Sequence, residues 1–470
     1  MPEGLFITLQ AFLFKKPEMA KILIISPISI GANMTGPAIR YWEFTKQLAL
    51  KHSIFLAAPT LEISSLLPQL PLTVQLYPSE KKTLEFLARE ADAILLQGLV
   101  SYHYPFLLKQ KAPLIIDLYD PVFLENLEIY TNLKEGETLA LHNFSLATQI
   151  QQLQHGDFFL CASEKQRDFW LGMLGAFNRL NPVTYQQDKT FRRLIDVVPF
   201  GIPSSPPRLS RRVLKGVYKT IGKDDFVVLW GGGLWNWFDP ITLIYAMKRI
   251  CEQRKNIKLF FMGVKYPSLE VSEMKKAREA IELAKSLNLY DRFVFFNDWV
   301  PYQERENYLL EADIGISIHT HTIETEFSFR TRILDYIWAG LPIIATRGDL
   351  LGSWIENNRL GLLVSPGDIE ELKQAILRMV DEPSLREHCK AQLSQIAPQL
   401  RWEKIIAPLE HFCERPEKAP DKILRGQLPA YPTLSRPLGY YAKKLLYYYR
   451  TGGVQYVVKK IRRLIHARNL

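Results

Sequence analysis

Short apolar runs alternate along the chain with longer segments of helical periodicity, which is typical of βαβ units. The first series of runs comprises Lys21–Ser26, Ile54–Ala58, Ala93–Gln97, Leu114–Asp117, Asp157–Cys161 and Asp196–Pro199. A second series comprises Phe226–Trp230, Ile257–Gly263, Phe293–Phe296, Asp313–Ile318, Pro342–Thr346 and Gly361–Ser365. Because the runs are apolar on consecutive residues, they predict parallel strands buried on both faces. The pattern therefore predicts an α/β protein with two doubly wound, Rossmann-like domains and a cleft between them, where ligands meet the carboxyl ends of the strands.

A chain of 470 residues is too long for one ordinary core, and the pattern divides it into five segments. They are an N-terminal appendage (1–18), the two domains (19–205 and 206–415), a proline-containing linker (416–437) and an aromatic, basic tail (438–470). At the start of one predicted helix Asp368 is placed as a cap, and Glu371 completes the spacing of a capping box. No run reaches about 18 apolar residues, so no membrane-spanning helix is expected.

The net charge of +10 is concentrated in the tail. Residues 438–470 contain eight Lys and Arg residues and no Asp or Glu, which leaves the rest of the chain near neutral. A near-neutral body argues against the alternative of a nucleic-acid-binding protein, since a nucleic-acid groove should be basic too. The four cysteines are widely spaced, so they predict neither a disulfide framework nor a zinc site and fit a reducing cytosol.

The tail has the pattern of a basic amphipathic helix. Its apolar residues recur at helical spacing, at Val454, Val457, Val458, Ile461, Leu464 and Ile465. The basic residues that fall largely on the other face are Lys459, Lys460, Arg462 and Arg463. We expect this segment to lie in an anionic membrane interface, on the cytoplasmic face, which would make the protein cytoplasmic and peripheral. The alternative is a helix packed on the protein's own core.

Glycine-rich turns follow the first strand of each series. Small residues let the backbone approach a ligand closely, and free N–H groups at a helix start favour anions. The ligand-binding candidates in these turns are Gly31, Gly36, Gly232, Gly233, Asn236 and Trp237. The alternative is a pair of ordinary strand-to-helix turns with the tryptophans in the core.

Two arginines, Arg330 and Arg332, stand at the predicted start of a helix, where the dipole favours acids instead. A bound anion would remove this conflict, and the arginine fork suits phosphate. The alternative is a pair of solvated arginines. His103, His319 and His321 have no further ligand cluster beside them, so no metal site is expected.

These motifs together resemble the retaining GT-B glycosyltransferases of family four, over roughly Lys21 to Glu414. Asp335–Thr346 (DYIWAGLPIIAT) is similar to the family's Glu-Ala-Met-Ala-x-Gly-x-Pro-Val-Ile-Ala-Thr segment, and Gly361–Asp368 (GLLVSPGD) to its Gly-x-Leu-Val-x-Pro-x-Asp. The glycine loop and helix at Gly31–Leu50 and the interdomain Val198–Ile202 (VPFGI) also fit. The resemblance implies that the C-terminal domain holds a nucleotide sugar and the N-terminal domain the acceptor.

By this resemblance Asp335 is the carboxylate that holds the nucleotide ribose. The position of the family's first carboxylate is Phe327 here, so Glu326 or Glu324 must substitute or its role is lost.

A second departure concerns charge, because the family's diphosphate-binding Arg and Lys correspond to Gly233 and Phe238. We expect Arg330 and Arg332 to supply the missing charge and to act as the main electrostatic catalysts, since a buried diphosphate should not be left unpaired.

On the acceptor side, Asp117, Tyr119 and Asp120 close a strand and are candidates for binding acceptor hydroxyls. A turn-capping role of Asp120 before Pro121 is the alternative. The resemblance implies a retaining transferase without a cofactor, which moves a sugar from a nucleotide-diphosphate donor to a glycan or lipid-linked acceptor of an envelope polysaccharide or glycolipid. The alternative function is a non-catalytic sugar-nucleotide-binding relative that supports a partner enzyme.

Overall fold

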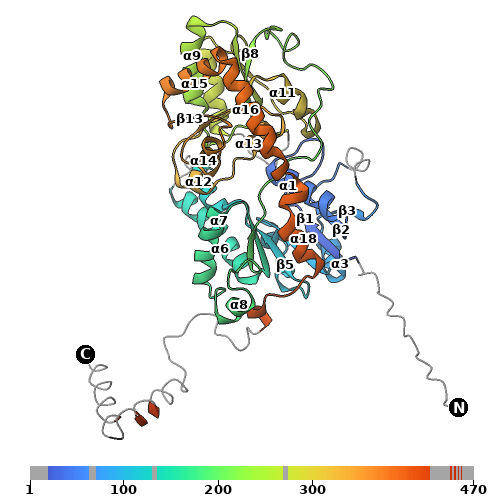
Figure 1. The fold of residues 1–470 in the computed structure, drawn as a ribbon. Coiled ribbons are helices and arrows are strands. Elements are labelled where there is room, and N and C mark those ends of the chain that lie inside the picture. The colour runs from blue at the N-terminus through green and yellow to red at the C-terminus, as the bar shows by residue number, and fades with distance from the viewer. Residues whose placement is uncertain are drawn as a thin grey trace, which may run out of the picture.

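The computed structural model describes residues 19–62, 70–129, 135–267 and 274–423, and in the tail Leu445, Leu446, Tyr449, Arg450, Val454 and Val457, which are helical. The chain forms two α/β domains stacked end to end, the N-terminal one below and the C-terminal one above in Figure 1. None of the described helices combines the length and the apolar character that crossing a bilayer requires. The predicted appendage, 1–18, lies outside the described residues, as does most of the predicted membrane-binding face of the tail apart from Val454 and Val457.

The N-terminal domain is built on a seven-stranded parallel sheet of order β3-β2-β1-β4-β5-β6-β7. Its strands are β1 (Lys21–Ile25), β2 (Ser53–Ala58), β3 (Val74–Pro78), β4 (Ala93–Leu96), β5 (Leu114–Asp117), β6 (Phe158–Cys161) and β7 (Ile195–Val197). The helices are α1 (Gly36–Leu48), α3 (Lys81–Glu90), α4 (Val100–His103), α5 (Val122–Ile129), α6 (Glu135–His155), α7 (Glu164–Ala176) and α8 (Pro182–Gln187). All six predicted runs are confirmed as strands. Strand β3 was not predicted, because this edge strand has no fully buried residue and hence no apolar run.

The C-terminal domain repeats this plan with a six-stranded parallel sheet of order β10-β9-β8-β11-β12-β13. Its strands are β8 (Phe226–Gly233), β9 (Ile257–Gly263), β10 (Val294–Phe296), β11 (Ile314–Ser317), β12 (Ile343–Thr346) and β13 (Gly361–Val364). The helices are α9 (Pro240–Gln253), α10 (Lys275–Ser286), α11 (Arg305–Glu311), α12 (Ile323–Phe327), α13 (Thr331–Trp338), α14 (Leu350–Asn357), α15 (Ile369–Asp381) and α16 (Pro383–Ile396). The strand order reverses between β8 and β11, and ligands of open parallel sheets bind at such a switch point.

Asp368 caps α15 as predicted. Its Oδ1 accepts the backbone N–H groups of Glu370 and Glu371 at 3.0 and 2.9 Å. Glu371 does not complete the capping box, because its Oε2 accepts the N–H of Ser365 instead, at 2.6 Å. The predicted start of the helix is therefore confirmed, whereas the Glu371 side chain accepts its backbone hydrogen bond from Ser365 and not from Asp368.

After α16 the chain crosses back to the N-terminal domain, as Figure 1 shows. Trp402 begins α17 (Trp402–Ile405) and packs edge-on against Phe44 of α1, with ring centroids 5.8 Å apart. Phe412 of α18 (Ala407–Glu414) stacks on Phe158 at 4.6 Å. The last described helices thus belong physically to the N-terminal domain.

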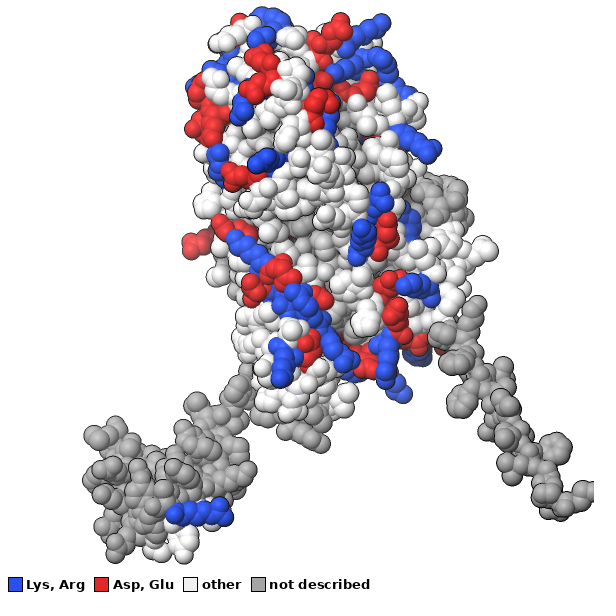
Figure 2. Space-filling view, in the orientation of Figure 1, with Lys and Arg blue, Asp and Glu red and all other residues white. Residues whose placement is uncertain are grey.

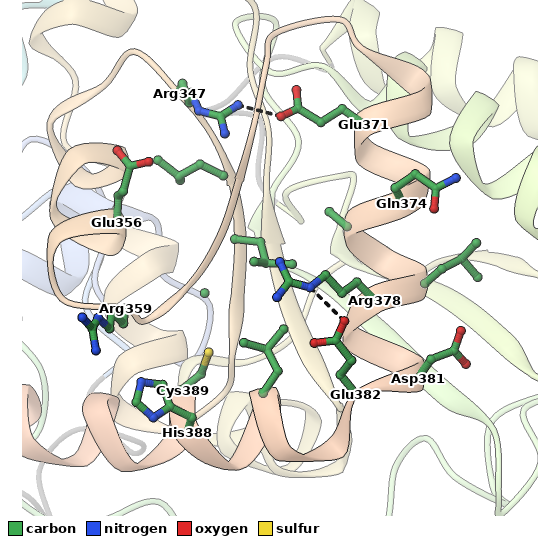
Figure 3. A pocket seen from close by; sticks show the side chains of 16 residues that line it. Arg347, Glu356, Arg359, Glu371, Gln374, Arg378, Asp381, Glu382, His388 and Cys389 are labelled. Carbon is green, nitrogen blue, oxygen red and sulfur yellow. Dashed lines mark hydrogen bonds and ion pairs between the residues drawn. The ribbon is translucent and has the colours of Figure 1, made fainter.

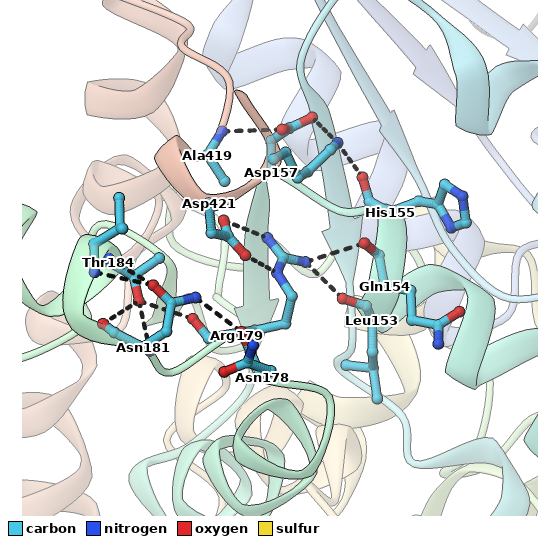
Figure 4. A network of polar contacts seen from close by, with 12 residues as sticks. Leu153, Gln154, His155, Asp157, Asn178, Arg179, Asn181, Thr184, Ala419 and Asp421 are labelled. Atoms are coloured by element: carbon cyan, nitrogen blue, oxygen red, sulfur yellow. Dashed lines mark hydrogen bonds and ion pairs between the residues drawn. The ribbon is translucent and has the colours of Figure 1, made fainter. Parts of the chain in front are cut away.

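A network of buried charges holds the next residues on the same domain (Figure 4). Asp157, fully buried before β6, pairs with Lys422 at 2.7 Å and Lys418 at 3.3 Å, and Arg179 pairs with Asp421 at 2.5 Å. A linker was expected from residue 416, but its described part, which includes α19 (Pro420–Ile423), is packed on the domain because the buried Asp157 needs cations. The rest of that segment lies outside the described residues.

Charged side chains of both signs are mixed over the two domains on the face drawn in Figure 2. This face of the described chain carries no extended field of a single sign, as expected for the near-neutral composition of the body.

Candidate active site

The C-terminal domain places Arg332 at the carboxyl end of β8, among aromatic rings. Its guanidinium carbon lies 3.9 Å from the ring centroid of Phe238 and 4.6 Å from that of Trp230. Its Nη2 donates to the carbonyl of Gly233 at 2.6 Å, while Nη1 has no hydrogen-bond partner among the described residues. Arg332 therefore lies beside Gly233 and Phe238, the two positions where the resemblance expects cations.

Arg332 has no ion-pair partner within the described chain. The residue is 6% exposed, and no carboxylate of the described ranges forms an ion pair with it. Burial lowers the pKa of Arg332 to about 9. A buried cation with an unused donor is costly, and a bound anion would remove that cost.

Arg330, by contrast, is neutralised inside the protein. Its Nη1 and Nη2 donate to the two carboxylate oxygens of Glu324 at 3.0 and 2.6 Å, and both residues are buried. Its guanidinium carbon lies 4.9 Å from the ring centroid of Phe238, and its Nε has no partner in the described chain. The sequence predicted two cations at this place, and the structure brings both there but balances the charge of one of them.

The candidates for the missing first carboxylate are both paired. Glu324 is bound to Arg330, and Glu326 forms an ion pair with Lys165 of the N-terminal domain. Phe327, at the family's carboxylate position, packs on Phe169 with ring centroids 4.7 Å apart. The segment around α12 is therefore part of the contact between the domains.

Asp335 lies on α13, and its side chain is 37% exposed. Its Oδ1 accepts a hydrogen bond from Nε of Arg305 at 3.1 Å. The Arg305 guanidinium lies 3.8 Å from the ring centroid of Tyr302 and 4.6 Å from that of Trp338. Arg305 was not predicted as a site residue, because it opens a short helix and belongs to none of the motifs.

The glycine turn after β8 is shaped by space and conformation. Gly232 has a φ of +86°, in the left-handed region that favours glycine. A Cβ at Gly233 would lie 2.9 Å from the ring of Trp235. The turn brings the backbone close to Arg332 without any side chain between them.

The other candidates in this turn form local structure. Trp237 stacks on Trp235 with ring centroids 5.8 Å apart and is buried. Asn236 accepts the backbone N–H of Lys276 through its Oδ1 at 3.2 Å. The alternative of core tryptophans in an ordinary turn therefore describes Trp237 better than a ligand contact does.

In the N-terminal domain the predicted glycine loop is tightly packed. A Cβ at Gly31 would lie 2.3 Å from the carboxylate of Glu62, and one at Gly36 would lie 3.3 Å from the hydroxyl of Tyr119. Gly36 begins α1, so Tyr119 and the start of that helix lie together.

This loop also faces the other domain. The backbone N–H of Tyr302 donates to the carbonyl of Ala32 at 2.9 Å, and the hydroxyl of Tyr266 donates to the carbonyl of Asn33 at 3.2 Å. The two domains are therefore in direct contact at the glycine loop.

Both carboxylate oxygens of Asp117, at the end of β5, accept hydrogen bonds within the N-terminal domain. Arg40 of α1 donates to its two oxygens at 2.7 and 3.0 Å, and both side chains are buried. Arg40 also donates to the carbonyls of Val198 and Pro199 at 2.8 and 2.9 Å. Asp117 was expected to contact the acceptor, and the structure places it instead in a buried pair that fixes α1 to the interdomain segment.

The remaining acceptor candidates lie near a residue that sequence analysis missed, Glu125 of α5. Tyr119 is buried, and the guanidinium carbon of Arg40 lies 4.9 Å from the centroid of the Tyr119 ring. Asp120 and Glu125 are partly buried, and α5 packs against α12 of the other domain. Burial, together with the charge of Glu324, raises the pKa of Glu125 to about 8, and burial also raises the pKa of Asp120 well above its usual range. Both carboxyl groups at this boundary therefore bind a proton more readily than a carboxyl group in water does.

Among the histidines singled out in the sequence, His319 is held by local polar contacts. His319 is buried, with Nε2 3.3 Å from Oδ2 of Asp349 and Nδ1 3.0 Å from the carbonyl of Thr320. In the described parts of the chain, no three or more His, Cys, Asp and Glu side chains are grouped so that they could hold a metal ion.

A pocket of about 860 Å³ lies elsewhere, at the edge strand β13 between α15 and α16 (Figure 3). Its charged side chains pair with one another, as Arg347 does with Glu371 and Arg378 with Glu382. None of the predicted site residues lines it.

Two parallel-sheet domains, each with a switch point, place this chain in the class of GT-B glycosyltransferase folds, which confirms the predicted fold class. Residues 225–382 match the family model of glycosyl transferases group 1, so the match covers most of the C-terminal domain.

Among solved structures, the chain is similar to HepE of Anabaena in complex with UDP-glucose, with 15% identity and a TM-score of 0.60 over 84% of this chain and 98% of that one. WaaG, a glycosyltransferase involved in lipopolysaccharide biosynthesis, gives 14% identity and a TM-score of 0.59 over 84% and 100%. A curated relative is the chitobiosyldiphosphodolichol beta-mannosyltransferase of Debaryomyces hansenii, 25% identical over 129 residues. That alignment spans 26% of this chain and 27% of the relative.

Proposed function

We propose that this protein is a glycosyltransferase that takes a nucleoside diphosphate sugar on its C-terminal domain and glycosylates an acceptor hydroxyl held at the N-terminal domain. The observation that carries the proposal is the uncompensated guanidinium of Arg332, with a free Nη1, beside the glycine turn of a GT-B domain. The pyrophosphate of a donor has the charge and the acceptor oxygens that this buried cation lacks. The match of residues 225–382 to glycosyl transferases group 1 supports the same conclusion.

We further propose transfer with retention, which rests on the resemblance to family four. The acceptor oxygen attacks the anomeric carbon from the face that the leaving group vacates. The bond between that carbon and the β-phosphate oxygen breaks, and the acceptor proton passes to the departing phosphate. Arg332 would stabilise the negative charge on the leaving diphosphate, a contribution worth about 10²–10³ in kcat for a single preorganised donor. Asp335, positioned by Arg305, would accept the ribose hydroxyls.

A thermal-shift screen with UDP, GDP, ADP and their sugar conjugates tests the donor site. At 100 times its Kd, a ligand stabilises the folded chain by about 2.7 kcal/mol, so the right nucleotide should raise the melting temperature clearly. The Arg332→Ala variant should lose this shift. Arg347→Ala is a matched control, because Arg347 lies on the same domain in an exposed ion pair, and it should keep the shift. A chain that responds to none of these nucleotides would contradict the proposal.

A second candidate function is a non-catalytic nucleotide-sugar-binding subunit. The pairing of Glu324 with Arg330 favours it, since these two candidates for the reaction neutralise each other. The two functions differ in turnover. Slow hydrolysis of the bound nucleotide sugar by the purified protein supports an enzyme, whereas tight binding without hydrolysis or transfer supports the subunit.

For the acceptor we propose a glycan, or a glycan linked to a lipid, of the cell envelope. The name of the curated relative, a mannosyltransferase of a dolichol-linked substrate, supports a lipid-linked acceptor. The basic amphipathic pattern of residues 438–470 supports peripheral attachment to an anionic cytoplasmic membrane face. Each basic residue near such a surface contributes about 1 kcal/mol.

Deletion of residues 438–470 should therefore abolish sedimentation with anionic vesicles and leave nucleotide binding intact. Glutamine at Lys459, Lys460, Arg462 and Arg463 keeps the length and the apolar face of the tail and should give the same result at physiological salt. Loss of nucleotide affinity on truncation would show that the tail is part of the core, and the membrane proposal would fall.

A further inference from the structure

The segment from Trp299 to Arg305, which follows β10 and ends on the first residue of α11, contacts both domains. At one end, a Cβ at Gly263 would lie 3.0 Å from Trp299, so Trp299 lies against the strand that flanks the glycine turn. At the other end, Tyr302 touches the N-terminal domain and Arg305 touches Asp335. A stretch of seven residues thus connects the proposed donor site with the acceptor domain.

Tyr302 is bound to the N-terminal domain at two points. Its backbone N–H donates to the carbonyl of Ala32 at 2.9 Å, and its hydroxyl donates to Oε1 of Glu43 at 3.1 Å. Glu43 lies on α1, is 2% exposed and also pairs with Lys46 at 2.7 Å. Burial raises the pKa of Tyr302 well above its usual range, so the phenol stays protonated and remains a donor.

Arg305 carries this contact to Asp335. Its Nη1 donates to the carbonyl of Tyr302 at 2.6 Å, and its guanidinium lies over the Tyr302 ring at 3.8 Å and the Trp338 ring at 4.6 Å. Its Nε donates a hydrogen bond to Oδ1 of Asp335 at 3.1 Å. A guanidinium fixed on two faces and at two nitrogens has little freedom, so it sets the direction of the carboxylate that it holds.

We infer that Tyr302 and Arg305 form an interdomain clasp that couples closure of the two domains to the orientation of the Asp335 carboxylate. When the domains separate, Tyr302 loses its hydrogen bonds to Ala32 and Glu43. The Tyr302 ring and carbonyl then no longer fix the Arg305 guanidinium, so Asp335 is not oriented for a ribose. By reciprocity, a nucleotide on Asp335 favours the closed arrangement by the same factor. The role assigned to Asp335 rests on the proposed function, but the clasp itself can be tested without a donor. Tyr302 and Arg305 are positioning residues, since neither is placed to contact the reacting atoms.

The first experiment uses the full chain without ligand. Tyr302→Phe removes one hydroxyl, and Glu43→Ala removes its partner on the other domain. Each variant should speed the hydrogen exchange of the peptide spanning 300–305 by roughly 2- to 10-fold, because this factor corresponds to the net free energy of one hydrogen bond. The double variant should exchange no faster than the faster single variant, because both changes break the same contact. Tyr308→Phe, a tyrosine change on α11, is the matched control and should leave this peptide unchanged. Unchanged exchange in both variants, or fully additive effects, would overturn the clasp.

The second experiment measures coupling to the donor site with UDP, GDP and ADP as probes. For the nucleotide that binds, Tyr302→Phe should lower the affinity about fivefold at an unchanged melting temperature. The same substitution should have no effect in an Asp335→Asn or Arg305→Gln background, and Arg305→Lys should recover part of the affinity lost in Arg305→Gln. Equal affinity of the native chain and Tyr302→Phe overturns the coupling and leaves the proposed function standing. Binding of none of the three nucleotides overturns both the proposed function and the coupling, while faster exchange in the first experiment still supports the interdomain contact between Tyr302 and Glu43.

Discussion

Each domain holds a buried arginine between aromatic rings, and the two arginines differ in how their charges are met. Arg40 of the N-terminal domain makes four hydrogen bonds, two of them to Asp117, and lies 4.5 and 4.9 Å from the ring centroids of Phe44 and Tyr119. Arg332 of the C-terminal domain lies between Trp230 and Phe238 but makes one hydrogen bond, to a carbonyl. No carboxylate in the described ranges forms an ion pair with it, whereas Arg40 is paired with Asp117.

This difference separates a structural arginine from a candidate binding residue. A buried cation that is paired and saturated with hydrogen bonds has no further donor to offer a ligand, and its loss leaves a buried carboxylate without a partner. A buried cation with an unused nitrogen raises the free energy of the free protein, and a ligand can recover that free energy. Burial depth and ring contacts alone do not distinguish the two, whereas the partner atoms do.

The largest effect is expected at Arg40. Arg40→Ala should lower the free energy of unfolding by about 3–5 kcal/mol, because Asp117 would stay buried and unpaired. Chemical denaturation measures this change. Arg40→Ala combined with Asp117→Ala should recover part of the loss, and a change below about 1 kcal/mol would show that the pair is not structural.

Arg332→Ala should give the opposite pattern. Transfer activity should fall by about 100-fold or more, while the free energy of unfolding stays level or rises, because an uncompensated buried charge is removed. Calorimetry should find a larger loss of affinity for the nucleoside diphosphate than for the nucleoside. An equal loss for both ligands would place the diphosphate elsewhere.

A smaller effect is expected at Asp335. Asp335→Asn keeps the shape of the side chain but makes it a poorer acceptor, which should weaken nucleoside monophosphate binding about tenfold. Asp381→Asn, in an exposed ion pair with Arg254, is a control that should change nothing. Unchanged affinity in Asp335→Asn would mean that the ribose is held by other residues.

The last effect concerns pH at the boundary of the domains. Glu125 ionises near its ordinary pKa of about 4.5 in the unfolded chain, whereas burial and Glu324 raise the pKa to about 8 in the folded one. Between these values the folded state binds a proton that the unfolded state does not, so the free energy of unfolding falls as pH rises through this window. Glu125→Gln should remove that slope in melts from pH 5 to 9, and the exposed Glu137→Gln should retain it. Parallel curves for the native chain and Glu125→Gln would rule out this titration.

Sequence pattern alone predicted twelve of the thirteen strands in the described parts of the chain, because strands buried on both faces of a parallel sheet must be apolar at consecutive positions. The exception, β3, lies at a sheet edge where burial is incomplete, so its pattern carried no such signal. The spacing of residues along the sequence also predicted the helix cap at Asp368 and the position of the two arginines at the start of α13, because both depend on neighbouring residues only.

Tertiary structure decided which of the predicted side chains remain free for chemistry. Asp117 is bound by a residue 77 positions away, and Glu326 by one 161 positions away, and neither partner stands out in the sequence. Tyr302 and Arg305 carry no motif, and their contacts arise because the fold brings the residues after β10 against α1 of the N-terminal domain and against α13. The apolar pattern along a helix or strand indicates which of its residues are buried, because the geometry of the element determines which side chains face the core. Whether a buried charge is balanced depends on which distant residue the fold brings to it, and that is how Arg330 came to be neutralised while Arg332 did not.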